Sequence, residues 1–208
     1  NLSGNYNIVG KVINFKDFGV PSSRTRTLVI GVRKDLKEIT PYDLFPQFQK
    51  SKSLKETIGD LPELKEMGEI DKKDIFHNFR NYNKCMRTWI SDLKEGESAF
   101  DNKNPKKRPH RVVDGKMVFN VNKNGDKYKR CFWNSIGPCI HTRNDILASQ
   151  ATVHPKDDRV FSIRELMKIM SIPNSFSWTN ISESELNKMP KEKKKEFLKS
   201  NEMNIRQS

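Results

Sequence analysis

Residues 15–33 read FKDFGVPSSRTRTLVIGVR, a turn followed by a segment that alternates as a β-strand does. With a period of two, Arg24 and Arg26 share the face that the apolar residues of the strand occupy further along, and they lie about 7 Å apart. Residues 6–15, YNIVGKVINF, also read as a strand, so the two segments predict a hairpin around the 18–23 loop. Paired cations at a strand end are suited to a cleft that binds an anion. An equally good interpretation is that they are two surface arginines on an edge strand.

The composition is that of a polar, basic, intracellular protein. The 208 residues are 34% hydrophobic and 31% charged, with a net charge of +13. No apolar run approaches the roughly 20 residues of a membrane span, and the N-terminus has no signal-peptide features. Residues 101–130 hold ten Lys and Arg against three Asp, a net +7 that predicts a polyanionic partner, although such a run can be a solvated loop.

The cysteines and histidines predict neither a disulfide framework nor a metal site. Cys85, Cys131 and Cys139 are odd in number and widely spaced, and there is no Cys-x-x-Cys pair. We therefore expect reduced thiols and no bound metal.

One long helix is predicted over residues 75–93, ending at Gly96. Its apolar face steps by three and four residues through Ile75, Phe79, Tyr82, Met86, Trp89 and Leu93. A second face carries a basic ridge of His77, Arg80, Lys84 and Arg87. Such a ridge contacts phosphates or is simply a solvated face.

Residues 96–130 read as loops and short strands. A hairpin is predicted where the strand 118–121 leads into the turn signal Asn124-Gly125-Asp126. The YKRCFW segment at 128–133 alternates basic and aromatic residues, which suits contact with bases and phosphates. A strand with one buried aromatic face explains the segment equally well.

Two helices are predicted in the last quarter of the chain. Ser162 and Glu165 form a capping box, with Ser162 as the N-cap, and the helix that follows ends at Pro173. From Ser182 onward the chain is charged and predicts a surface helix with a frayed end.

The GVPSSRTR segment, followed by its apolar strand, resembles the Gln-x-Arg-x-Arg segment of the DNA (cytosine-5) methyltransferases. The resemblance implies that Arg26 helps to hold the target cytosine and that Arg24 orders the active site. The family's glutamine falls on Ser22, which leaves the role of that glutamine in doubt.

The resemblance continues along most of the chain. Four segments are similar to the variable region of a bacterial subgroup: HNFR at 77–80, GESAFDN at 96–102, KRPHR at 107–111 and YKR at 128–130. The segments TRN at 142–144, SQ at 149–150 and TVHP at 152–155 lead into RVFSIREL at 159–166, which resembles the family's late Arg-x-Leu-Thr-x-Arg-Glu segment, with Ser162 in place of threonine.

The fold implied is α+β in two parts. Residues 1–45 would be an antiparallel hairpin from the edge of a Rossmann-like methyltransferase sheet. Residues 46–208 would be a mixed small target-recognition domain, with the late-motif helix at about 159–173 and a charged C-terminal helix.

The catalytic motifs of the family are absent from this sequence. The reaction adds a cysteine thiolate to carbon 6 of a flipped cytosine, transfers a methyl group from S-adenosylmethionine to carbon 5, and then eliminates the enzyme. The Gly-rich cofactor loop, Pro-Cys-Gln and Glu-Asn-Val segments are missing, as is the late Gly-Asn-x-Val-Pro segment. Pro138-Cys139 lacks their context, so Cys139 is not expected to be the nucleophile.

The sequence thus predicts the target-recognition portion of a methyltransferase from a bacterial restriction-modification system. It would be inactive alone, would not bind S-adenosylmethionine, and would leave Arg24 and Arg26 facing solvent. The expected partners are double-stranded DNA and the missing catalytic domain, in the same gene or a separate subunit; we expect a cytoplasmic, nucleoid-associated monomer. The candidate DNA-binding residues are His77, Arg80, Lys84, Arg87, Lys107, Arg108, Arg111, Lys129, Arg130, Thr142 and Arg143.

Two other functions remain open. A stand-alone sequence-specific DNA-binding module without a catalytic partner would show the same basic segments. RNA binding is disfavoured because the chain has no paired recognition-motif aromatics and no Gly-x-x-Gly loop.

Overall fold

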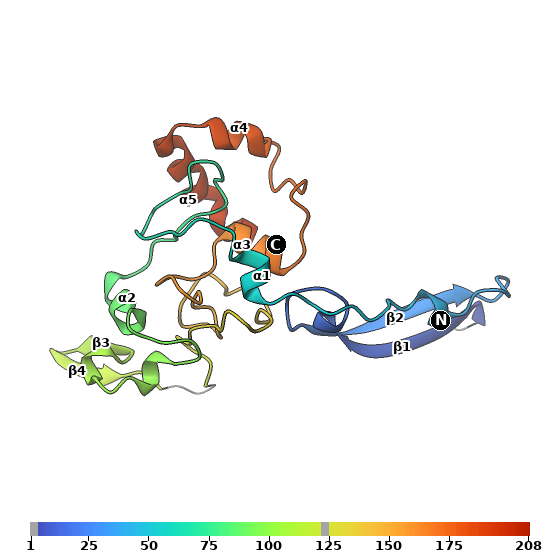
Figure 1. Ribbon diagram of the computed structural model, residues 1–208, viewed down its shortest axis with the longest axis horizontal. Helices are drawn as coiled ribbons and strands as arrows, with labels where there is room; N and C mark the ends of the chain where they lie inside the picture. Colours follow the sequence, from blue (N-terminus) through green and yellow to red (C-terminus); the bar gives the residue numbers. More distant parts are fainter. Residues whose placement is uncertain (1–3, 122–124) are drawn as a thin grey trace.

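The two strands expected around the 18–23 loop form an antiparallel hairpin that projects from the remainder of the chain (Figure 1). A computed structural model describes residues 4–121 and 125–208. Strand β1 (Tyr6–Asn14) pairs with β2 (Thr25–Arg33), and the register runs from Tyr6 opposite Arg33 to Asn14 opposite Thr25. The predicted alternation is confirmed, because the side chains of β2 become progressively buried on the face that Arg26 begins.

The hairpin is covered on one face only. The 3₁₀ turn Pro41–Leu44 crosses the covered face, which carries Lys11. There the Lys11 ammonium lies 4.9 Å from the ring centroid of Tyr42 and 4.7 Å from that of Phe45. On the other face large apolar side chains remain exposed: Ile8 (44%), Val12 (73%) and Val29 (60%). A two-stranded hairpin with an open apolar face has little stability of its own.

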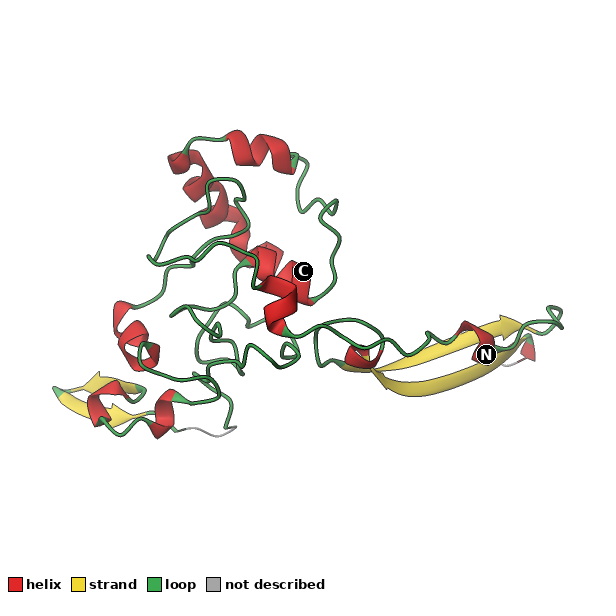
Figure 2. Ribbon diagram, in the orientation of Figure 1, coloured by secondary structure: helices red, strands yellow, loops and turns green. Residues whose placement is uncertain are grey.

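Most of the remaining chain is loop, interrupted by helices (Figure 2). These helices are α1 (Leu54–Ile58), α2 (Lys84–Ile90), α3 (Ile163–Ile169), α4 (Glu183–Lys188) and α5 (Lys191–Gln207). Additional 3₁₀ turns cover Phe15–Asp17, Ala99–Asp101 and Pro105–Lys107.

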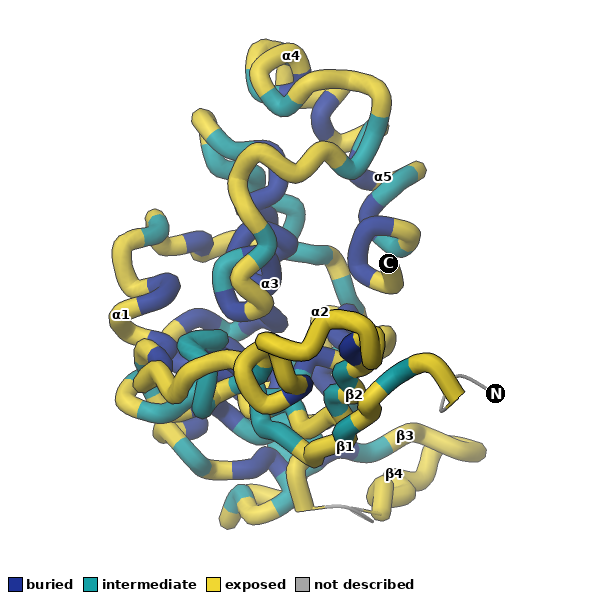
Figure 3. The backbone as a smooth tube through the Cα atoms, turned by 90° about the vertical axis from the view of Figure 1, so that its right-hand side faces the viewer, coloured by how far each residue is buried: buried dark blue, intermediate teal, exposed yellow. Residues whose placement is uncertain are grey.

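Helix α3 is the centre of the packing (Figure 3). Leu166 and Ile169 pack against α1, while Ile163 and Met167 pack against α5 and the segment at 75–76. The expected capping box is confirmed, since Ser162 N donates to Glu165 Oε2 at 2.7 Å and Ser162 Oγ accepts from Glu165 N at 3.2 Å. A third cluster joins α2 to the loops around Tyr128 and Leu147.

The long helix predicted over residues 75–93 is wrong in its first half. Only Lys84–Ile90 is helical. Asp71 Oδ1 accepts from the amides of Lys73 and Asp74, and Asp74 Oδ1 accepts from that of Phe76, so carboxylates replace the carbonyl partners of a helix. Phe79 is then held by a backbone bond to Glu69.

The second hairpin turns earlier than predicted. Strand β3 (His110–Val113) pairs with β4 (Lys116–Phe119) around Asp114 and Gly115, whose φ angles are 49° and 74°. Positive φ at both central residues is the requirement of a type I′ turn, for which Asp-Gly is a preferred pair. The turn expected at 124–126 is therefore not the hairpin turn, and Asn124 lies outside the described residues.

The charged C-terminal segment is two helices and not one surface helix. Pro190 separates α4 from α5. Leu198, Ile205 and Arg206 on α5 are buried, and the helix continues to Gln207 instead of fraying.

Candidate nucleic-acid interface

The base of the first hairpin is joined to residues 137–140 by backbone and side-chain hydrogen bonds. Ser23 N donates to Gly137 O at 2.9 Å, and Gly137 N donates to Pro21 O at 3.1 Å. The buried Ser22 Oγ donates to Pro138 O at 2.9 Å. A Cβ at residue 137 would lie 2.7 Å from Pro21 O, so this close approach requires glycine. We call this contact the joint.

Arg24 belongs to the joint. Its Nη1 donates to Ile140 O at 3.0 Å, and its side chain is half-buried. The expectation that both arginines face solvent is therefore wrong for Arg24, because the carbonyl oxygen of the facing loop takes its guanidinium. Arg26, two residues further along, is exposed and donates to the carbonyl oxygen of its neighbour Thr25.

Two predicted DNA-binding residues lie in the interior. His77 is fully buried, with Nδ1 3.0 Å from Ser162 Oγ and Nε2 2.7 Å from Pro62 O. Arg130 is 3% exposed and donates to three backbone carbonyl oxygens and to Asp158 Oδ1. Both side chains connect loops in the interior and are too buried to contact DNA.

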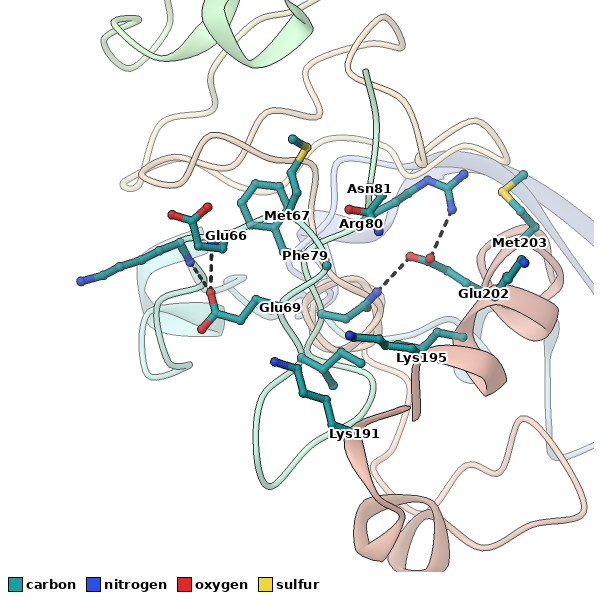
Figure 4. A pocket seen from close by; sticks show the side chains of 16 residues that line it. Glu66, Met67, Glu69, Phe79, Arg80, Asn81, Lys191, Lys195, Glu202 and Met203 are labelled. Atoms are coloured by element: carbon teal, nitrogen blue, oxygen red, sulfur yellow. Dashed lines mark hydrogen bonds and ion pairs between the residues drawn. The ribbon is translucent and has the colours of Figure 1, made fainter. Parts of the chain in front are cut away.

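The basic ridge expected along one helix is not formed, because residues 75–83 are not helical. Arg80 lies 3.5 Å from Asp145 and 3.2 Å from Glu202, and Figure 4 shows the second of these ion pairs. Arg87 donates to the carbonyl oxygen of Lys65 at 2.6 Å. Lys84 stays exposed at the start of α2.

Figure 4 looks into a groove of about 990 Å³ between α5 and the loops at 65–70 and 78–81. Lys191, Lys195 and Lys199 line it from one side of α5. Glu202 is committed to Arg80 and to the buried Arg206.

The remaining predicted residues differ in how free they are. Arg111, Thr142 and Arg143 are exposed, whereas Lys107, Arg108 and Lys129 are half-buried. Lys107 Nζ lies 2.9 Å from Asp92 Oδ2, and Arg108 Nε donates to Asn102 O at 2.6 Å.

The β3–β4 hairpin, which we call the ribbon, places further side chains at the surface. All its strand residues except His110 are exposed. His110 packs against Trp89 with ring centroids 5.4 Å apart, and Asn120 N donates to Pro109 O at 2.9 Å, so the ribbon is fixed at its base. Val113, Lys116 and Val118 were not predicted as surface residues of a hairpin, although the Asp-Gly pair at 114–115 is a local signal for this turn.

A buried ionic network supports the segment before α3. Arg159 lies 2.7 Å from Asp157 Oδ2 and 2.7 Å from Glu165 Oε2, with each of the three side chains at most 3% exposed. Burial by itself would raise the pKa of Glu165, but the charge of Arg159 lowers that pKa well below its usual value. Glu165 is thus an ionised carboxylate in the core.

His154 is the neutral member of the network. Its Nδ1 accepts from the amides of Asp157 and Lys156 at 2.9 and 3.2 Å, and its Nε2 lies 3.5 Å from Glu165 Oε1. Burial lowers the pKa of His154 from 6.5 to about 4.

Acidification is therefore expected to destabilise the chain through His154. The folded-state pKa is below the unfolded value, so the unfolded chain binds the extra proton, and stability is lost as the pH falls from 6.5 to about 4. The expected loss is on the order of 3 kcal/mol, measured by urea unfolding across this pH range. His154→Asn keeps an acceptor for the two amides and should flatten this dependence. The exposed His141→Asn variant is the control, and an unchanged slope in His154→Asn would contradict the assignment.

The described part of the chain shows neither a candidate membrane span nor a candidate metal site. Among residues 4–121 and 125–208, no helix is long and apolar enough to cross a membrane. In the same ranges, no three His, Cys, Asp or Glu side chains are grouped as metal ligands would be.

Comparison with known proteins decides the family. The sequence model of the C-5 cytosine-specific DNA methylases matches residues 2–190. The chain belongs to this family. Type II methyltransferase M1.HgaI of Avibacterium volantium is 28% identical over 182 residues, covering 82% of this chain and 47% of that protein. Type II methyltransferase M.DdeI of Desulfomicrobium norvegicum is 27% identical over 197 residues, covering 82% of this chain and 45% of that protein.

This methylase-family chain spans less than half the length of those two relatives. Its fold is similar to that of a crystal structure described as a DNA modification methyltransferase encoded within a prophage (E. coli). The TM-score is 0.51 at 18% identity, and the match covers 81% of this chain and 51% of that one. The likeness supports a mixed α+β fold with small antiparallel sheets.

Proposed function

We propose that this chain is the target-recognition part of a DNA (cytosine-5) methyltransferase, together with the hairpin that connects it to the catalytic part. The observation that carries the proposal is the joint. Ser22 and Arg24 connect the base of the hairpin to residues 137–140, while Arg26 on β2 is exposed and donates only to its neighbour Thr25. An element that is fixed at one end and open along its length suits a connection between two parts of an enzyme.

The open face of the hairpin supports this role. Ile8, Val12 and Val29 expose apolar surface that soluble proteins usually cover. We expect the catalytic part to cover this face and its sheet to pair edge to edge with the hairpin, so that β1 and β2 extend that sheet. Arg26 lies on the opposite face of the hairpin, near the joint, and this end of that face would be directed toward the catalytic centre.

Arg26 and Arg24 have separate roles in the proposed enzyme. The guanidinium of Arg26 would donate hydrogen bonds to the acceptor atoms of the flipped cytosine. Arg24 would act through position, because its bond to Ile140 O fixes where β2 begins relative to the recognition loops.

S-adenosylmethionine, which supplies the methyl group in this family's reaction, does not fit the residues present here. The groove in Figure 4 has enough volume, but its lining is net positive and would disfavour the positively charged sulfonium. Its cationic side chains are Lys65, Arg80, Lys191, Lys195 and Lys199, against the carboxylates of Glu66, Glu69 and Glu202. We therefore expect the cofactor to bind the catalytic part and expect the chain alone to be inactive.

Duplex DNA is the proposed partner of the recognition part. The exposed candidates Lys84, Arg111, Thr142 and Arg143 are free to contact it. Lys107, Arg108 and Lys129 are half-buried and would contact DNA only with their outer atoms.

Reconstitution tests the proposal. The chain is mixed with a catalytic part that carries the missing motifs, and methyl transfer from S-adenosylmethionine to duplex DNA is measured and mapped by bisulfite sequencing. We expect methylation at one sequence with both parts present and none with either part alone. Specific DNA binding without methylation in any mixture would favour a stand-alone DNA-binding module instead.

A further inference from the structure

We propose that the ribbon enters the major groove of DNA and reads base edges with one of its two faces, the face that carries Arg111, Val113, Lys116 and Val118. This inference rests on the proposed function and specifies which element selects the target sequence.

The register of the ribbon defines the reading face. Arg111 lies opposite Val118, and Val113 lies opposite Lys116. Because paired residues of an antiparallel ribbon point to the same side, these four form one face. The other face holds His110, Val112, Met117 and Phe119, and at its base His110 packs against Trp89. The face with both cations is therefore the one directed away from the protein body at the base.

The shape of the ribbon matches the major groove. Each strand has four residues, which gives a length of about 13 Å. The major groove is about 12 Å wide and admits a two-stranded ribbon, whereas the minor groove is only about 6 Å wide. Since the ribbon is fixed at its base by Trp89 and by the Asn120–Pro109 hydrogen bond, little ordering is needed for insertion.

The exposed apolar side chains of the ribbon indicate that a partner covers them. On the reading face, Val113 is 44% exposed and Val118 is 37% exposed. The net charge of +7 over residues 101–130 disfavours a second copy of this chain, because two such regions would repel each other, and it favours the phosphates that flank a DNA groove.

The chemistry of the reading face predicts what it recognises. The Arg111 guanidinium suits O6 and N7 of guanine, and valine side chains contact the methyl group of thymine. Arginine and valine lie directly opposite each other on the ribbon, so we expect the recognised site to contain a guanine and a thymine at neighbouring positions.

The test uses duplexes selected from a random pool for binding to this chain. Thymidines in the selected site are then replaced one at a time by deoxyuridine, which lacks only the methyl group. We expect about a fourfold loss of affinity at a contacted thymine for the unmodified chain and no loss for Val113→Ser or Val118→Ser. Arg111→Ala should reduce discrimination at one guanine by about five- to 150-fold.

Val112→Ser is the matched control, because Val112 is more exposed and lies on the opposite face. It should select the same site with the same affinity as the unmodified chain. If the reading-face variants also bind the selected site normally and deoxyuridine has no effect, the inference is wrong while the proposed function stands. If no sequence is selected, both are wrong. Thermal unfolding of each variant confirms that these surface changes leave the fold intact.

Discussion

Replacing Arg26 with alanine in the assembled methyltransferase is expected to reduce kcat by about 10²- to 10³-fold while leaving affinity for the specific duplex nearly unchanged. Arg26 is exposed and bonds the carbonyl oxygen of its neighbour Thr25, so its removal should cost the fold little. In the enzyme, the guanidinium would contact a base only after that base leaves the helix. Losing one preorganised donor at a reacting group typically has an effect of this size.

The measurement compares single-turnover methyl transfer with duplex binding for the same variant. Arg33→Ala is the matched control: Arg33 lies at the far end of β2, is exposed, and forms an ion pair with Asp35. We expect near-normal rates for this control. Equal losses of binding and turnover in Arg26→Ala would mean that the residue supports the structure and not the reaction.

Local patterns predicted those parts of the fold whose partners are close in sequence. The alternation of residues 24–33 gave the correct facing of β2, because strand side chains alternate whatever covers them. Ser162 and Glu165 formed the expected capping box, which depends only on residues three apart. The Asp-Gly turn of the ribbon is an equally local signal, but the prediction placed the hairpin turn at residues 124–126 instead.

Long-range contacts explain the parts that the sequence did not predict. The apolar spacing of Ile75 and Phe79 is helical, and both side chains are buried, but the backbone between them is bonded to Asp71, Asp74 and Glu69 instead of to itself. Hydrophobic periodicity reports burial, and here a turn achieves the same burial.

The burial of two candidate DNA-binding residues depends on distant partners and was not predicted. His77 is bonded to Ser162, 85 residues away, and Arg130 to the carbonyl oxygen of Ile90, 40 residues away. A cationic side chain in a basic segment carries no local sign of such partners. Of the alternative interpretation of residues 128–133, a strand with a buried aromatic face, only the burial of Tyr128 is confirmed, because its φ angle of 51° is not that of a strand and Phe132 is exposed.

Arg159→Met is expected to lower the free energy of unfolding by about 3–5 kcal/mol, the largest stability effect predicted for this chain. The substitution would leave the carboxylates of Asp157 and Glu165 buried without their shared counter-charge. Glu165 also accepts from Ser162 N, so the uncompensated charge would disturb the start of α3, on which two of the three hydrophobic clusters depend. Urea unfolding at neutral pH measures the loss.

Lys168→Ala provides the contrast, because it removes an ion pair whose carboxylate, Asp60, is 72% exposed, and it should cost no more than about 1 kcal/mol. A double variant, Arg159→Met with Glu165→Gln, should be more stable than Arg159→Met alone, since it removes one buried charge that the single variant leaves unpaired. If Arg159→Met costs no more than Lys168→Ala, water or a rearranged side chain must compensate the carboxylates. The role of Arg159 would then be to position the loop at 154–162 and not to stabilise the fold, because Arg159 links that loop to α3 through Glu165.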